Sequence, residues 1–272
     1  MMARRPGPVA LILAVLVAVF LLMPLIAVIP VSFTPRRLLS MPEGEWSLRH
    51  YRALIENPQW AQGLWLSIRI GVVASVVATT LATAFSLGLW MLRPRLAGLW
   101  MGIALLPMVA PPVVSALTLY FFLINLSKVN SFVAFDTWAG VALAHSVMVA
   151  PFAVVLVTVS LSQVDRRIDL VARSMGATLW QRIFRVILPN IRFGVIAALF
   201  LTFVLSWEEI GVTLFITSVN AVTLPRMMWM GLRDNIDPAI AAISVVLIVI
   251  VVTVLVAKSI WQWSARRRAE RG

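Results

Sequence analysis

Two adjacent acidic residues, Glu208 and Glu209, lie inside an otherwise apolar segment of this sequence. A carboxylate within a bilayer costs several kcal/mol unless it faces water or a partner. Glu208 follows Phe193 by 15 residues, which is roughly 22 Å along a helix and places the pair in the outer part of a bilayer. Three interpretations stay open: the carboxylates contact a polar or cationic solute or form a gate, they pair with a neighbouring helix or subunit, or they lie in interfacial water.

Other residues that interrupt the apolar segments are His145 and the prolines Pro107, Pro111 and Pro112. His145 has no partner at metal-ligand spacing, so it either bonds to a neighbouring helix or relays protons. The prolines remove backbone donors, so a kink or a break is expected there. Broken helices at membrane depth are tolerated where protein or a water-filled cavity surrounds them. A packing kink and a pathway-lining role remain equal alternatives.

The composition defines the class of protein that must position these residues. The chain has 272 residues, 61% of them hydrophobic and 12% charged, with a mean hydropathy of +0.96. Soluble domains carry roughly 25% charged residues, so an ordinary soluble enzyme is excluded, and so is disorder. The chain has no cysteine, which excludes disulfides, a thiol nucleophile and Cys-ligated metals. We predict an all-α, polytopic membrane protein.

Six segments are long and apolar enough to cross a bilayer, which takes about 20 residues. The first has arginines before it, as a cleavable signal peptide does, but its length favours a retained helix. We predict one transmembrane domain over residues 1–272, with an external loop at 32–65 and a cytoplasmic loop at 162–190. The predicted spans are 9–31, 66–92, 99–124, 138–161, 191–216 and 239–263.

The basic residues predict the orientation. With the N-terminus inside, fourteen Lys and Arg residues lie on the cytoplasmic side and seven on the opposite side. Cytoplasmic loops carry the excess of Lys and Arg, so both termini are expected in the cytoplasm. The net charge of +12 is explained by these clusters, and no nucleic-acid partner is needed.

The 162–190 loop has the pattern of two short helices. Apolar residues at helical spacing predict a first helix over residues 166–175, with Asp165 as its N-cap, ended by Gly176. The sequence Thr178-Leu179-Trp180-Gln181 is a capping-box pattern that opens the second helix. Pro189 suits the first turn of the next membrane helix. An amphipathic helix lying on anionic lipid would fit the same composition.

These residues resemble the EAA loop of binding-protein-dependent ABC importer permeases, in which Glu-Ala-Ala is followed by a glycine and then by Ile-x-Leu-Pro. Leu170 and Val171 depart from that pattern, because they stand where the family has its Glu and first Ala, and Asp169 lies one residue earlier. The resemblance implies an ATPase-coupling loop. Its expected residues are Asp169, Ala172, Arg173, Gly176, Ala177, Trp180, Leu188 and Pro189.

A second stretch is similar to the spermidine/putrescine-type permeases, most of all to their C-type subunit. It includes Ser206-Trp207-Glu208-Glu209, Leu224-Pro225 and the run 235–240. Related importers of other polar solutes share the pattern. The resemblance, with the broken third span, implies a translocation pathway or gate. Its expected residues are Trp207, Glu208, Glu209, Pro111 and Pro112.

The resemblance implies the function as well. It implies an inner-membrane permease that forms half of the pathway for a small polar solute, such as a polyamine or a related amine or amino-acid-like compound. Its implied partners are a homologous second permease, two cytosolic ABC ATPases and an extracytoplasmic binding protein. No Walker A sequence is present, so no catalytic site, cofactor or metal is expected here; ATP and Mg²⁺ would bind the ATPases.

Two other classes fit part of the pattern. A secondary transporter would use Glu208 and Glu209 for proton coupling, would work as this chain alone, and would carry inverted repeats that are not evident here. A lipid-binding scaffold would leave the broken helix and the acidic pair without a purpose. The EAA-like loop favours the importer over both.

Overall fold

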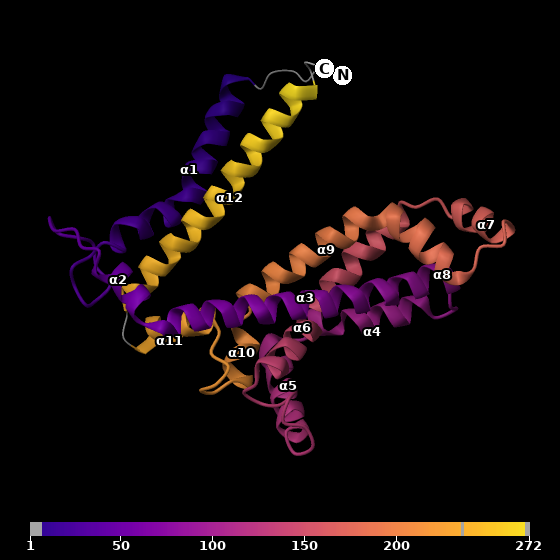
Figure 1. Ribbon diagram of the computed structural model, residues 1–272, viewed down its shortest axis with the longest axis horizontal. Coiled ribbons are helices and arrows are strands. Elements are labelled where there is room, and N and C mark those ends of the chain that lie inside the picture. Colours follow the sequence, from indigo (N-terminus) through magenta and orange to yellow (C-terminus); the bar gives the residue numbers. More distant parts are fainter. Residues whose placement is uncertain (1–6, 235–236, 270–272) are drawn as a thin grey trace. The chain divides into compact units, whose positions relative to one another are not determined.

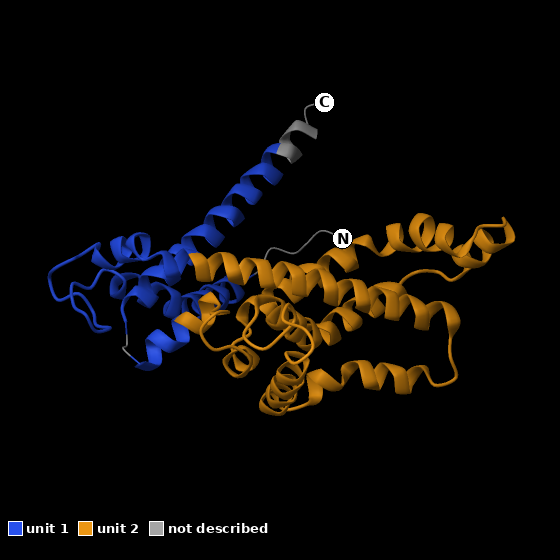
Figure 2. Cartoon of the chain, turned by 60° about the horizontal axis from the view of Figure 1, so that its bottom comes forward, with its two compact units in different colours: residues 1–61, 228–272 blue, residues 62–227 orange. Residues whose placement is uncertain are grey.

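The computed structural model describes residues 7–234 and 237–269, and every regular element in that part of the chain is a helix. It divides into two compact units, residues 1–61 with 228–272 and residues 62–227 (Figure 2). Some residues used above lie outside the described part, so the structure says nothing of them. They are Arg4, Arg5, Asn235, Ile236 and Arg271.

The first unit holds α1 (Pro8–Val31), α2 (Arg49–Glu56) and α12 (Ala239–Ala269). α1 runs beside α12, and α2 packs on α12 (Figure 1). After α1 the chain is held by a hydrogen bond of 2.7 Å between the hydroxyls of Ser32 and Tyr51. No residue of α1 is buried.

The predicted external loop 32–65 is not a plain loop, since it contains α2.

The second unit begins within α3 (Pro58–Leu92), which starts earlier than the predicted residue 66 because Pro58 suits a first helical turn. The unit ends within α11 (Leu224–Asp234). Between them the chain forms α4 (Ala97–Val109), α5 (Pro112–Leu126), α6 (Trp138–Ser162), α7 (Arg167–Ser174), α8 (Leu179–Gln181), the π-helix η1 (Arg182–Ile187), α9 (Leu188–Glu208) and α10 (Gly211–Ile216).

α6 is the central helix of this unit, and its two halves belong to two apolar clusters. The first half packs with α5 and α10, and the second half with α3, η1 and α9. Small residues allow close approach, as packing in lipid requires. Ala74, Ala78 and Ala82 form a buried stripe on α3, and a side chain at Gly194 of α9 would overlap Ser160 of α6. Small residues of the second span thus form a buried face.

Two of the predicted spans are broken. The third bends by 97° between α4 and α5, and α5 turns away from the line of α4 (Figure 1). Ala110 is extended there, because the residue before a proline is disfavoured in the helical conformation, and Pro111 and Pro112 follow. The fifth span was predicted to be one helix over 191–216, and this is wrong. α9 ends at Glu208, Glu209 is extended, and α10 begins at Gly211.

Membrane crossing remains consistent with these breaks. Five helices in the described residues are long and apolar enough to span a bilayer, or six if the bent pair α4 and α5 counts as one span. The all-α polytopic class is therefore confirmed.

Candidate functional site

The 162–190 loop folds as a helix, a glycine turn and a second helix. Gly176 has a φ of +80°, the left-handed conformation that ends α7, and the N–H of Ala177 donates to the carbonyl of Ala172 at 3.0 Å. Thr178 and Gln181 form the predicted capping box, with each side chain accepting from the other residue's backbone N–H. The predicted N-cap of α7 is corrected: Arg166 occupies it, and Asp165 accepts from the N–H of Arg167 instead.

An ion pair joins the two halves of this loop. The guanidinium of Arg182 donates two hydrogen bonds to the carboxylate of Asp169, at 2.7 and 2.6 Å, and the two side chains are only 13% and 12% exposed. Two parallel N–H···O bonds fix both distance and orientation. The structure thus places Arg182 of η1 against Asp169 of α7. Asp169 is thus occupied within the loop.

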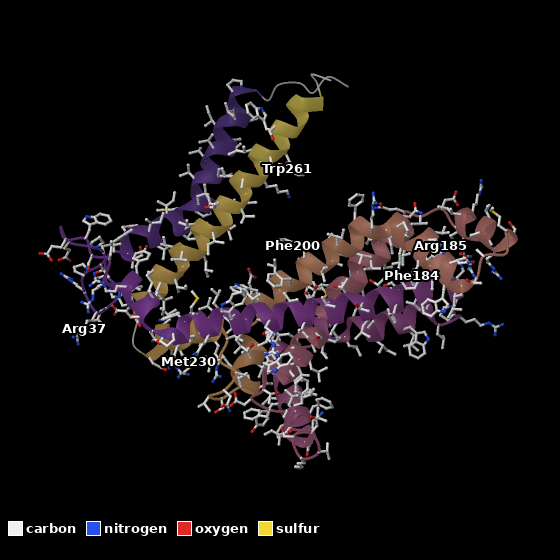
Figure 3. The ribbon with its side chains drawn as sticks, in the orientation of Figure 1. Arg37, Phe184, Arg185, Phe200, Met230 and Trp261 are labelled. Carbon is white, nitrogen blue, oxygen red and sulfur yellow. The ribbon has the colours of Figure 1, made fainter. Side chains whose placement is uncertain are left out.

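The same loop exposes several large apolar side chains. Met175 is 81% exposed, Trp180 68% and Leu170 60%, whereas Ala172 is buried. The rings of Trp180 and Phe184 stack with their centroids 5.5 Å apart, and Phe184 and Arg185 lie at the end of the unit that carries α7 and α8 (Figure 3). Of the other expected loop residues, Arg173, Gly176 and Pro189 are exposed and Ala177 and Leu188 are half-buried.

An apolar cavity of about 520 Å³ lies between the second half of α3 and the helices that follow the glycine turn. Its wall includes Trp180, Phe184 and Leu188. Trp180 and Leu188 therefore belong to one cavity wall, together with Thr83 and Leu87 of α3.

The α9–α10 break separates the two acidic residues. Glu208 is the last residue of α9 and is exposed, whereas Glu209 is half-buried and turns back onto α10. The Glu209 carboxylate accepts from the N–H of Val212 at 2.9 Å, and its carbonyl accepts from the hydroxyl of Thr213 at 2.8 Å. A carboxylate at a helix N-terminus satisfies donors that have no partner within the helix. Glu209 therefore stabilises the break, and the pair does not act as one unit.

A second cavity, of about 220 Å³, lies beside this break. Glu209 and Pro112 both line it, so the structure brings together one residue of the acidic pair and one of the proline pair. Pro111 is exposed at the start of α5 and is not part of its wall, and Trp207 packs near Phe203 with a centroid distance of 6.3 Å. The other residues that line this second cavity are Pro107, Met108, Ala110, Met148, Val149, Phe152 and Leu205.

His145 of α6 bridges the break from the other side. The side chain is 1% exposed; Nδ1 lies 2.9 Å from the Ser206 hydroxyl and Nε2 lies 2.8 Å from that of Thr213. Because Thr213 uses its hydroxyl proton on the carbonyl of Glu209, the Nε2–H of His145 donates to Thr213, and Nδ1 accepts from Ser206. The interpretation of a histidine bonded to neighbouring helices is confirmed.

Asp136, just before α6, is a residue whose importance sequence reasoning missed. Its carboxylate accepts from the backbone N–H groups of residues 218–221 and from the side-chain amide of Asn220, at 2.7 to 3.3 Å. Burial raises the pKa of Asp136, but these backbone hydrogen bonds outweigh it and hold the pKa below its usual value. No local pattern in the sequence indicates this role, because the partners of Asp136 lie more than 80 residues away.

Comparison with known proteins places these features in a family. A model described as the inner membrane component of binding-protein-dependent transport systems matches residues 81–269. The putrescine transport system permease protein PotI of Escherichia coli (strain K12) is 26% identical over 243 residues, which cover 89% of this chain and 86% of that protein. The molybdenum transport system permease protein ModB of Mycobacterium bovis is 31% identical over 215 residues, covering 75% and 80%.

A solved structure is similar over almost the whole chain. It is that of a bacterial ABC transporter involved in the import of the acidic polysaccharide alginate, with a TM-score of 0.65, 12% identity, and coverage of 96% of this chain and 99% of that one. That likeness shows the fold. With the family model matching well over half of the residues, the chain belongs to the inner membrane components of binding-protein-dependent transport systems, and it is a transport component rather than an enzyme.

Proposed function

We propose that this chain is the permease subunit of an ATP-driven importer and forms half of the pathway for a small polar solute. A homologous permease would form the other half, two cytosolic ABC ATPases would bind ATP and Mg²⁺, and an extracytoplasmic binding protein would deliver the solute. Both termini would face the cytoplasm. No nucleic acid and no cofactor of its own enter this proposal.

The observation that carries the proposal is the exposed apolar surface of the 162–190 loop on a firmly built scaffold. Leu170, Met175 and Trp180 project from a turn that a glycine, a capping box and a two-bond ion pair hold in shape. Large apolar side chains exposed together on a rigid support are typical of a surface that a partner covers. We assign this surface to the ATPases, so that α7, α8 and η1 couple ATP hydrolysis to movement of α9.

α6 gives such movement a route to the other site. It follows Asp136 and precedes the loop, and its 25 residues span about 37 Å. In its first half it contacts α10 through His145, and at its C-terminal end the chain leads into α7. A shift of the loop would bias the α9–α10 break between two states, as ligands at two sites of one two-state element do.

We propose a cationic cargo, of which a polyamine is the simplest form, because Glu209 is the one carboxylate among the lining residues of the 220 Å³ cavity. The relationship to PotI supports a polyamine, and the relationship to ModB makes molybdate the comparison to test. The family supports the importer over the proton-coupled alternative, which no relative named above supports.

The test is uptake by the complete complex in proteoliposomes, with ATPases and binding protein supplied. We expect ATP-dependent uptake of labelled putrescine and none of molybdate. Uptake by this chain alone under a proton gradient would contradict the importer, and uptake of molybdate without putrescine would contradict the cationic cargo.

Exchange of Glu209 for Gln tests the role of the carboxylate, with Glu208→Gln as the matched control one residue away. A carboxylate and an ammonium near 4 Å attract by about 4 kcal/mol at an effective dielectric of 20, before desolvation is subtracted. A net loss of about 1.4 kcal/mol would lower uptake roughly ten-fold for Glu209→Gln. The exposed Glu208→Gln should transport normally. Wild-type uptake by both variants at normal complex yield would remove the acidic pair from the mechanism.

A further inference from the structure

The 217–223 loop, which joins α10 to α11, is held by a single side chain from another part of the chain. Asp136 lies between α5 and α6, and its two carboxylate oxygens accept from the N–H groups of Ser218, Val219, Asn220 and Ala221. The Asn220 side chain adds a fifth donor at 2.9 Å. Hydrogen bonds to a carboxylate are roughly twice as strong as those between neutral groups. The single carboxylate of Asp136 therefore supplies the acceptors that a helix or a sheet would otherwise supply to these backbone N–H groups.

The backbone of Asp136 completes this arrangement. Its N–H donates to the carbonyl of Ile216, the last residue of α10, at 3.0 Å. Its φ of 57° lies in the left-handed region, where Asp and Asn are far more common than other residues with a side chain. Both the carboxylate and the backbone of this residue are therefore committed to α10 and to the loop that follows it.

A buried cation lies near the carboxylate without bonding to it. Arg226 is 8% exposed, its charge interacts with that of Asp136, and its Nε and Nη1 have no hydrogen-bond acceptor among the described residues. The carboxylate of Asp136 is thus hydrogen-bonded to the loop amides and not to Arg226. A buried charge that lacks hydrogen-bond partners is tolerated only where a nearby opposite charge compensates it.

We propose that Asp136 is a positioning residue: its carboxylate fixes the 217–223 loop and the adjoining end of α10, and so sets the geometry of the α9–α10 break. The link to the break is short, because α10 has six residues and carries both Thr213, which bonds His145, and Val212, which bonds Glu209. The part of this proposal that concerns transport rests on the proposed function.

Asp136→Asn is the informative variant. Asparagine tolerates the left-handed backbone and keeps the shape, but it replaces one acceptor oxygen with an amino group that faces N–H donors. The matched control is Ser218→Ala, since the exposed Ser218 contributes only its backbone N–H to the carboxylate.

The measurement is hydrogen exchange of the assembled complex in nanodiscs. For Asp136→Asn we expect the amides of residues 218–221 to exchange about ten-fold faster or more, with α6 and α9 unchanged. Ser218→Ala should exchange as the wild type does. Unchanged loop exchange in Asp136→Asn would overturn the proposal, and so would faster exchange throughout α6 and α9, which would indicate a role in folding only.

A double variant separates geometry from charge. If the hydrogen bonds position the loop, Asp136→Asn with Arg226→Met should exchange as fast as Asp136→Asn alone. Restoration of slow exchange would mean that the uncompensated charge of Arg226 displaced the loop, and would overturn the positioning role.

Uptake gives the functional readout. We expect the maximal uptake rate of Asp136→Asn to fall about five-fold, with the half-saturating concentration of solute-loaded binding protein within about two-fold of wild type, because the break is misplaced while binding is kept. Normal uptake beside fast loop exchange would overturn the link to transport. The exchange experiment needs no solute, so a failure of the proposed function leaves its result decisive.

Discussion

The 162–190 loop and the α9–α10 break differ in which side chains they expose and in how their polar groups are bonded. The loop leaves several large apolar side chains exposed, and it pairs two of its charged residues, Asp169 and Arg182, with each other. The break links a set of polar groups to one another, of which His145 and Thr213 are buried and Glu209 is half-buried. An exposed apolar surface is completed by a partner, whereas a buried polar network is complete within the chain. The loop is therefore suited to the docking role proposed for it, and the polar network at the break links α6, α9 and α10.

The comparison predicts that the largest loss of stability comes from the buried network. Replacing His145 with Leu keeps the volume but removes hydrogen bonds to Ser206 and Thr213, so the free energy of unfolding should fall by about 2–4 kcal/mol. Thermal unfolding of the purified protein in detergent measures it. His145→Gln, which keeps a donor in reach of Thr213, should lose less. Equal losses of unfolding free energy in the two variants would mean that altered packing around position 145, and not the lost hydrogen bonds, causes the destabilisation.

The next largest effect is expected at the glycine turn. Gly176→Val introduces a β-branched residue at a φ of +80°, where strain costs about 1–2 kcal/mol or more, although nothing lies within 4 Å of the added Cβ. The permease should still insert, while co-purification of the ATPase falls. Gly176→Asn tolerates this backbone and should retain the ATPase. A Val variant that binds the ATPase at full yield would contradict the assignment of the loop as a docking surface.

The smallest effect is expected from the ion pair. Arg182→Gln leaves Asp169 without its partner, and we expect a loss of about 1 kcal/mol, because the pair is shielded but lies near the surface of the loop. ATPase affinity, measured by titration, should fall by about five-fold. Exchanging the two residues, as Asp169→Arg with Arg182→Asp, should recover part of it. A double variant as weak as the sum of its single variants would show that the two charges do not act as a pair.

The two regions also differ in how far sequence reasoning reaches. The glycine turn and the capping box of the loop depend on residues within a few positions of each other, so local chemistry predicted both. The Asp169–Arg182 pair depends on the angle between α7 and α8, which no local pattern specifies. The N-cap of α7 was predicted one residue too early, at Asp165 instead of Arg166. Here the obstacle is that the exact first residue of a helix depends on capping geometry, which the sequence pattern does not fix.

At the break, distance along the chain is the obstacle. The apolar run 191–216 predicts a continuous helix, and only Glu209 with Gly211 indicates otherwise, through a carboxylate and a glycine beside the start of α10. The partners of His145 lie 61 and 68 residues away, and those of Asp136 more than 80. Sequence reasoning correctly expected a bonded histidine, but only the packing of α6 against α9 and α10 identifies its partners.

The exposure of α1 determines which amino-acid substitutions this helix tolerates. None of its 24 residues is buried in the chain, and nearly all are aliphatic. Lipid tails are as apolar as leucine, so exchanges among Val, Leu, Ile and Ala on this helix change little in the free energy of the chain by itself. A charged residue there would cost several kcal/mol. Within the chain, α1 is thus constrained in length and polarity but hardly in sequence. A position on it that resists aliphatic exchange would identify a specific contact, either with α12 or with a partner outside the chain.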